Sequence, residues 1–260
     1  MSETPVLWSM DERGVAHVIL NRPTVNNAYD GGMIDGLHEA MDALSGEPKL
    51  RVVVVTGNGR HFQAGADLTW LNAVRAGTRE DNIEASRRTA GAVDRLNRLP
   101  VATVALIQGF CVGGGTGLAA ACDVVVAADT ATFAISEARW GLTAAIIIPQ
   151  LADAIGARQI RRYALTGERF GADEARRIGL VHEVVPASDL SAAGDRIVEA
   201  LLANGPKAIA ETKATALQHA YGLIGNDAMD GLVEAHAAKR MSEEAGEGLA
   251  SFKEKRPARW

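Results

Sequence analysis

The sequence predicts an α/β fold, in which the strands of a parallel sheet alternate with helices. Short uncharged runs rich in β-branched residues alternate with segments whose apolar residues recur at helical spacing, a pattern typical of parallel strands joined by helices. After Pro186 the alternation ends, and three helical segments follow. We therefore expect an α/β core over residues 1–186 and a helical C-terminal region over residues 187–260.

The elements of the core can be assigned in chain order. Each expected strand is a short apolar run, as in strands that are buried on both faces, and each expected helix has apolar residues three or four positions apart. The predicted strands cover residues 15–21, 51–57, 101–109, 124–128 and 131–135. The predicted helices cover residues 31–44 and 79–99, and a third begins at the glycine run after residue 112.

The C-terminal region is predicted to contain helices over residues 188–203, 206–221 and 227–241. Pro206 stands at the start of the second helix, where its missing N–H is not needed. No strand-like run separates these segments, so we expect a helical appendage to the core.

Composition and charge narrow the class of protein. The 260 residues are 47% hydrophobic and 23% charged, as in ordinary globular proteins. The net charge of −5 and the lack of a basic stripe argue against nucleic-acid binding. Both cysteines, Cys111 and Cys122, lie in apolar surroundings and are expected to be buried reduced thiols. The N-terminus resembles no signal peptide, so we expect a cytoplasmic enzyme.

One uncharged segment, residues 99–122, is long enough to suggest a membrane helix. Pro100, Gly109 and the glycine run interrupt it. We therefore interpret it as a buried strand, a turn and a buried helix, and expect no membrane association.

The glycine run at residues 113–117 needs a physical reason, because glycine costs about 1 kcal/mol relative to alanine inside a helix. It could cradle a phosphate, pack closely against another backbone, or present bare N–H groups to a ligand. The spacing of Gly113, Gly115 and Leu118 does not fit the dinucleotide fingerprint G-x-G-x-x-G, and no Walker lysine follows. What remains is a helix N-terminus whose N–H groups can bind a developing oxyanion.

A second oxyanion donor is expected from FQAGADL, residues 62–68, which follows the strand over residues 51–57. Asp67 is predicted to cap the helix that begins there. This role is compatible with the backbone N–H of Ala66 facing a ligand.

Other catalytic patterns are absent from the sequence. The six histidines form no cluster with cysteines or with one another, so we expect no metal site. No G-x-S-x-G nucleophile elbow occurs.

Six segments, in order and at consistent spacing, resemble the crotonase superfamily of enoyl-CoA hydratases and isomerases. They are NRPTVNNA (21–28), HFQAGADL (61–68), IQGFCVGGGTGLAAACDVVVAAD (107–129), FAISEARWGL (133–142), ALTGERFGADEARRIGLVHEVVP (164–186) and FKEKRPARW (252–260). The resemblance implies a spiral of repeated ββα units with a helical C-terminal trimerisation region, assembled as a homotrimer or a dimer of trimers.

The resemblance also implies chemistry on acyl-CoA thioesters, without a further cofactor. The thioester oxygen would accept hydrogen bonds from the backbone N–H groups of Ala66 and Gly114. The resemblance further implies that five residues contact the substrate or CoA, namely Ala64, Asp67, Leu68, Phe252 and Lys255.

The family's hydratases carry two catalytic glutamates, and this sequence matches only one of them. Glu137 occupies the second position, whereas Gly117 stands at the first. One such acid–base group contributes about 10²–10⁴-fold to a rate, so the absence of a glutamate at position 117 bears on which reaction is expected. The resemblance favours an enoyl-CoA hydratase, with a branched glutaconyl-type ester as a possible substrate. An isomerase that uses a single glutamate, and an acyl-CoA-binding protein without catalysis, remain open.

Overall fold

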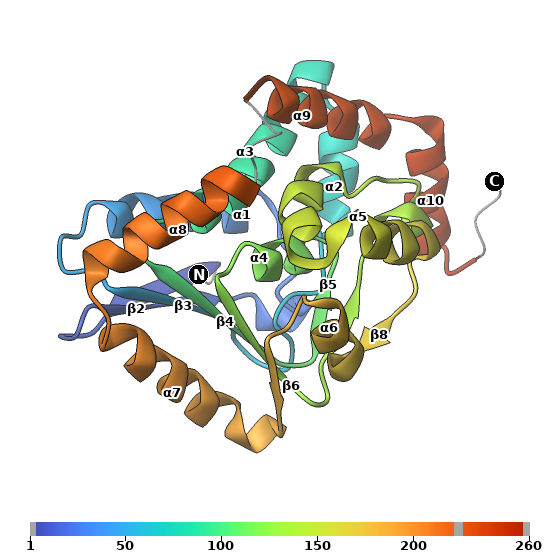
Figure 1. Cartoon of the computed structure of the whole chain (residues 1–260). Helices are drawn as coiled ribbons and strands as arrows, with labels where there is room; N and C mark the ends of the chain where they lie inside the picture. Colours follow the sequence, from blue (N-terminus) through green and yellow to red (C-terminus); the bar gives the residue numbers. More distant parts are fainter. Residues whose placement is uncertain (1–3, 221–225, 257–260) are drawn as a thin grey trace.

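Six strands form the main sheet in the order β1–β2–β3–β4–β6–β9 in the computed structural model, which describes residues 4–220 and 226–256 (Figure 1). β1 is antiparallel to β2, and every other neighbouring pair is parallel. The strands are β1 (Val6–Met10), β2 (Val15–Leu20), β3 (Val52–Gly57), β4 (Ala102–Ile107), β6 (Val124–Ala128) and β9 (Glu183–Val185). The predicted α/β class with a largely parallel sheet is therefore confirmed.

A second, smaller sheet follows the C-terminal ends of these strands. It contains β5 (Phe110–Val112), β7 (Thr132–Ala134) and β8 (Phe170–Gly171), with β5 parallel to β7. Isolated bridges between Gln63 and Cys111 and between Tyr29 and Ala66 extend the same parallel pairing towards the N-terminus. These pairings bring the segments that follow β2, β3 and β4 side by side.

The helices in the described residues connect these strands and cover the sheet. They are α1 (Gly31–Ser45), α2 (Leu68–Arg75), α3 (Arg79–Asn97), α4 (Gly114–Ala120), α5 (Ile148–Thr166), α6 (Ala172–Ile178), α7 (Leu190–Leu202), α8 (Pro206–Ala220), α9 (Asn226–Arg240) and α10 (Glu243–Lys253). The order of main-sheet strand, second pairing segment and helix recurs in β2–Tyr29–α1, β3–Gln63–α2, β4–β5–α4 and β6–β7–α5. This recurrence is the expected series of ββα units.

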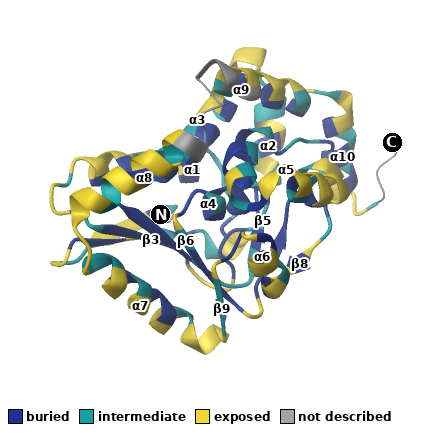
Figure 2. Cartoon of the chain, viewed as in Figure 1, coloured by how far each residue is buried: buried dark blue, intermediate teal, exposed yellow. Residues whose placement is uncertain are grey.

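The core lies between the main sheet and the helices of these units (Figure 2). The central strands β3 and β4 consist almost wholly of buried residues, which explains their uninterrupted apolar sequences. Both cysteines are buried and free, as expected. The uncharged segment at residues 99–122 contains β4, β5 and α4. In the described ranges, no helix is long and apolar enough to cross a membrane.

Several elements were not anticipated from the sequence. They include the short strands β1, β5, β8 and β9 and the helices α5 and α6. The prediction of three C-terminal helices was also incomplete, because α10 follows α9. The short strands have only two to five residues, too few to show a period clearly.

The C-terminal helices pack against different parts of the core. α7 lies along one face of the main sheet, against β3, β4 and β6, whereas α9 packs on α3 (Figure 1). α10 packs against the 3₁₀ turn η2 (Glu137–Trp140). The region after residue 186 therefore contacts the segment that contains Glu137, and the division of the chain at residues 186 and 187 stays a prediction.

Candidate active site

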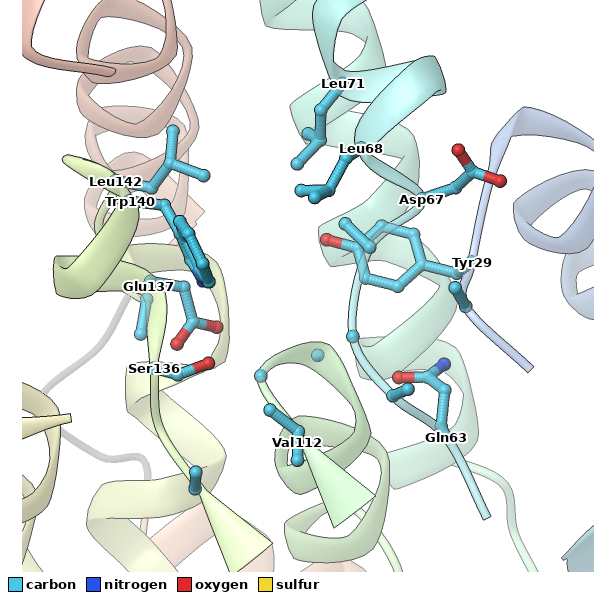
Figure 3. A pocket seen from close by; sticks show the side chains of 18 of the residues that line it. Tyr29, Gln63, Asp67, Leu68, Leu71, Val112, Ser136, Glu137, Trp140 and Leu142 are labelled. Carbon is cyan, nitrogen blue, oxygen red and sulfur yellow. The ribbon is translucent and has the colours of Figure 1, made fainter. Parts of the chain in front are cut away.

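A cavity of about 1220 Å³ lies where the segments after β3 and β5 meet η2 and the C-terminal helices. Its lining includes Ala66, Gly114 and Glu137, which are far apart in sequence. Figure 3 shows Glu137 on one wall and Tyr29 on the opposite wall, with both polar ends directed into the cavity. The structure thus brings the three predicted site residues together.

The backbone at Ala66 and Gly114 has two available donors. Tyr29 N–H bonds to the carbonyl of Gly65 (2.8 Å), and Asp67 N–H bonds to the carbonyl of Tyr29 (2.8 Å), but the intervening Ala66 N–H has no acceptor in the described part of the chain. Gly114 is the first residue of α4, and its N–H is likewise without an acceptor there. Two unpaired N–H groups at one cavity can bind an oxygen that gains negative charge.

Gly113 allows the loops around these donors to approach closely. Its φ of +56° is strained for residues with a side chain. A Cβ built on Gly113 would lie 3.2 Å from Glu137 Oε1 and 3.6 Å from the Cα of Gly65. The carboxyl of Glu137 therefore lies directly over the turn that presents Gly114, beside the loop that presents Ala66.

Glu137 is held in a desolvated position. Burial raises its pKa to about 7, and the nearby backbone of Ser136 and Glu137 offsets only part of this effect. The Oε2 atom has no hydrogen-bond partner within the described residues. A carboxyl whose pKa lies near neutrality can both accept and return a proton.

Tyr29 forms the wall opposite Glu137. Its ring is so close to the glycine run that a Cβ on Gly114 would lie 2.6 Å from Tyr29 Cε1. Burial raises the pKa of Tyr29 to about 12, so its hydroxyl stays protonated and can donate a hydrogen bond. The need for glycine at position 114 therefore includes contact with this ring, which the sequence did not indicate.

Gly117 faces Ile147 of the 3₁₀ turn η3 (Ala145–Ile147) rather than an open space. A Cβ on Gly117 would lie 2.3 Å from Ile147 Cγ2 and 2.7 Å from Ile147 Cβ. Ile147 is buried and lines the cavity. The side of the cavity where the resemblance implies a first glutamate is thus apolar and filled.

Asp67 caps α2, as predicted. Its Oδ1 accepts from the N–H groups of Thr69 (2.9 Å) and Trp70 (3.3 Å), and its Oδ2 lies 3.2 Å from Arg22. The side chain points away from the cavity in Figure 3, although the residue belongs to its lining. Asp67 therefore fixes the loop that carries Ala66.

The other predicted substrate contacts are placed unequally. Ala64, Leu68 and Phe252 line the cavity, and the Phe252 ring packs edge-on against Trp140 with 4.6 Å between centroids. Lys255 is exposed and is not part of the lining. A contact between Lys255 and CoA stays a prediction.

Tyr29 and the buried Arg240 of α9 are cavity residues that the sequence analysis did not single out. Tyr29 follows a strand at the same edge as Ala66, and this position was the available signal. Arg240 stands among other charged residues at a helix end, and nothing local distinguishes it. In residues 4–220 and 226–256, no group of three or more His, Cys, Asp or Glu side chains is placed to hold a metal ion.

Comparisons with known proteins agree with this architecture. The sequence matches the family described as enoyl-CoA hydratase/isomerase over residues 10–260. The hydroxycinnamoyl-CoA hydratase-lyase of Pseudomonas fluorescens is 35% identical over 206 residues, covering 78% of this chain and 74% of that protein. The mitochondrial Delta(3,5)-Delta(2,4)-dienoyl-CoA isomerase of Dictyostelium discoideum is 29% identical over 256 residues, covering 95% of this chain and 87% of that protein.

A crystal structure of an enoyl-CoA hydratase from Shewanella pealeana superimposes with a TM-score of 0.81 at 33% identity, covering 98% of this chain and 96% of that one. The ββα series and this similarity define a protein of the crotonase fold class. The chain belongs to the enoyl-CoA hydratase/isomerase family. Its relatives carry both hydratase and isomerase names, so membership leaves the reaction open between the two.

Proposed function

We propose that this protein is an enoyl-CoA hydratase that adds water to a 2-enoyl-CoA thioester. The observation that carries the proposal is the position of Glu137. Its desolvated carboxyl lies over Gly113, next to the unpaired N–H groups of Ala66 and Gly114. The arrangement suits an acid–base group beside a site for a thioester oxygen.

The proposed reaction uses Glu137 twice. The thioester carbonyl oxygen accepts hydrogen bonds from Ala66 N–H and Gly114 N–H, which draws electrons from the double bond. Glu137 carboxylate takes a proton from water, and the resulting hydroxide bonds to C3 while the electron pair of the double bond forms an enolate. The protonated Glu137 then returns the proton to C2. Water is added in total, and Glu137 ends as a carboxylate.

An isomerase is the second candidate, and the contact between Gly117 and Ile147 favours it. Moving a double bond needs removal of a proton from one carbon and its delivery to another, which a single glutamate can perform. The apolar filling beside Gly117 provides no second carboxylate. An acyl-CoA-binding protein without catalysis is the third outcome that the experiment below distinguishes.

Mass analysis of products distinguishes these functions. The full-length protein is incubated with 2-enoyl-CoA and 3-enoyl-CoA esters, including a branched glutaconyl type, which we propose as one candidate substrate. A gain of one water by a 2-enoyl ester supports the hydratase. Conversion of a 3-enoyl ester at constant mass, with no hydration of any 2-enoyl ester, would support the isomerase instead. Saturable binding without turnover would leave the binding protein.

The proposal also includes the assembly and location implied by the resemblance: a homotrimer or dimer of trimers in the cytoplasm, acting on acyl-CoA. Light scattering at micromolar concentration tests the assembly. A monomer under these conditions would contradict it.

A further inference from the structure

Arg240, the last residue of α9, lines the same cavity as Glu137 but takes no part in the proposed reaction. The residue is only 1% exposed. Its Nη2 donates to Ser86 Oγ (2.8 Å) and to His236 Nδ1 (3.0 Å). Its Nε and Nη1 atoms are buried and have no partner within the described ranges. One edge of the guanidinium is therefore fixed, while donors on the rest of the group are unsatisfied.

The groups around Arg240 do not neutralise its charge. Burial, and then the charge of Arg240, lower the pKa of His236 to about 3, so the imidazole is neutral and accepts at Nδ1. Ser86 is also neutral, and no ion pair to Arg240 occurs among the described residues. A buried cation without a counter-charge is costly to the fold. This cost needs an explanation beyond packing.

The position of Arg240 at a helix end does not account for its unpaired atoms. The C-terminus of a helix favours a cation through its carbonyl groups. Here, however, Nε and Nη1 bond to none of them. The guanidinium carbon lies 5.9 Å from the centre of the Trp70 ring, another neutral contact. Trp70, Ser86 and His236 orient the guanidinium and leave donors available.

Tyr29 connects Arg240 with the proposed reaction centre. Its ring contacts Trp70 edge-on, with 5.7 Å between centroids, and also approaches Gly114. The charges of Arg240 and Glu137 act on the Tyr29 hydroxyl in opposite directions, so Tyr29 lies near both. An acyl chain that extends from the thioester site at Gly114 along Tyr29 would approach Arg240.

We propose that Arg240 binds a carboxylate at the end of the acyl chain, so that the preferred substrates are CoA thioesters of unsaturated dicarboxylic acids. This inference rests on the proposed function, since it places the thioester beside Gly114. A carboxylate matches the planar guanidinium through two parallel hydrogen bonds and supplies the missing counter-charge. The protonated Tyr29 hydroxyl is a further donor for the same group.

Calorimetric binding to saturated thioesters tests the assignment without any turnover. Glutaryl-CoA is compared with valeryl-CoA, and adipyl-CoA with hexanoyl-CoA, so that each pair differs by the terminal carboxylate at equal carbon number. We expect at least one acid ester to bind about tenfold or more tighter to the wild type than its neutral counterpart, because a buried polar group left unpaired penalises the neutral ligand. Arg240→Met should abolish this preference.

Arg87→Met is the matched control, because Arg87 is an exposed arginine on α3 next to Ser86 in sequence. It should keep the preference. Equal binding within both pairs by the wild type would overturn the assignment. So would an Arg240→Met variant that binds all four esters more weakly by the same factor, because that result indicates contact with the CoA phosphates. The comparison of acid and neutral esters on the wild type tests the proposal even where Arg240→Met does not fold.

Turnover of glutaconyl-CoA and of 2-pentenoyl-CoA separates this inference from the proposed function. Preferential binding of an acid ester with no reaction of either enoyl ester would retain the role of Arg240 and refute the hydratase. Hydration of both enoyl esters with equal efficiency, together with equal binding within each pair, would retain the hydratase and refute the role of Arg240.

Discussion

Glu137 and Arg240 line one cavity without a counter-charge, Glu137 partly buried and Arg240 fully buried, but their charges respond to desolvation in different ways. Glu137 can lose its charge by binding a proton, and its pKa rises to about 7. Burial lowers the pKa of Arg240, yet a guanidinium remains protonated in proteins. An acceptor that enters the cavity can satisfy the donors that lack a partner among the described residues.

The difference teaches how to interpret an unsatisfied buried group. An unpartnered carboxyl with a pKa near neutrality is suited to proton exchange. An unpartnered guanidinium is suited to anion binding and to no proton transfer. Substitutions at the two positions should therefore change different measured quantities.

The largest expected effect is the loss of turnover in Glu137→Gln, which keeps the shape of the side chain but removes the base. We expect kcat to fall by about 10²–10⁴-fold. The fall should be similar for acid and neutral esters, whereas binding of saturated thioesters should persist. Steady-state kinetics with both kinds of ester measure this. The exposed Glu84→Gln on α3 is the control, and near-normal turnover by folded Glu137→Gln would refute the base.

A slightly smaller loss is expected when one oxyanion donor is removed. Gly114→Pro deletes the N–H at the first position of α4, where proline suits a helix. Either proline or alanine at 114 places a Cβ against Tyr29, so Gly114→Ala controls for crowding. We expect the proline variant to lose about 10²–10³-fold more turnover than the alanine variant. Equal rates for the two would remove Gly114 N–H from the mechanism.

The site could be predicted from the sequence only where local pattern and chemistry coincide. The glycine run, the cap at Asp67 and the strand before Glu137 are local features, and the structure brings Ala66, Gly114 and Glu137 to one cavity. Their catalytic roles stay predictions. The main parallel strands were equally predictable, because strands buried on both faces are continuously apolar.

What the sequence did not indicate depends on tertiary contacts. Arg240 resembles any charged residue near a helix end, and only the packing of α9 on α3 buries it. The contact of Ile147 with Gly117 joins two segments thirty positions apart, so the apolar filling could not be inferred from either segment. Short strands such as β8 exist because of their partners rather than their own sequence.

The contact between Gly117 and Ile147 predicts a moderate loss of stability. Gly117→Ala forces a Cβ to within 2.3 Å of Ile147 Cγ2, so a buried side chain must shift. Overpacking of this kind costs about 1–3 kcal/mol. Gly117→Glu should be at least as destabilising and should not create a second catalytic carboxylate, which keeps this side of the cavity unlike the Glu137 side.

A double-mutant cycle checks the cause. Ile147→Gly removes all three Ile147 side-chain atoms that a Cβ at position 117 would meet, so Gly117→Ala should cost less in that background. Unfolding in urea measures the four free energies. An equal cost of Gly117→Ala in both backgrounds would show that Ile147 is not the obstacle.

The last expected effect, no larger than that of Gly117→Ala, is a pH-dependent difference in stability that only the carboxyl end of the cavity should show. The pKa of Glu137 rises from 4.5 to about 7 on folding. Between these values the folded protein binds more protons at Glu137 than the unfolded chain, so this contribution to stability is present below pH 4.5 and is lost as pH rises through 7. Glu137→Gln does not titrate and avoids the loss. We expect the free energy of unfolding of Glu137→Gln to gain about 1–3 kcal/mol over that of the wild type between pH 5 and pH 8, allowing for partial solvent access.

Arg240→Met should differ from the wild type in free energy of unfolding by the same amount at pH 7 and pH 8, because the guanidinium stays charged. Urea unfolding at fixed protein concentration measures both differences. A Glu137→Gln difference that is the same at pH 5 and pH 8 would mean that the carboxyl has an ordinary pKa, and the contrast between the two ends of the cavity would then fail.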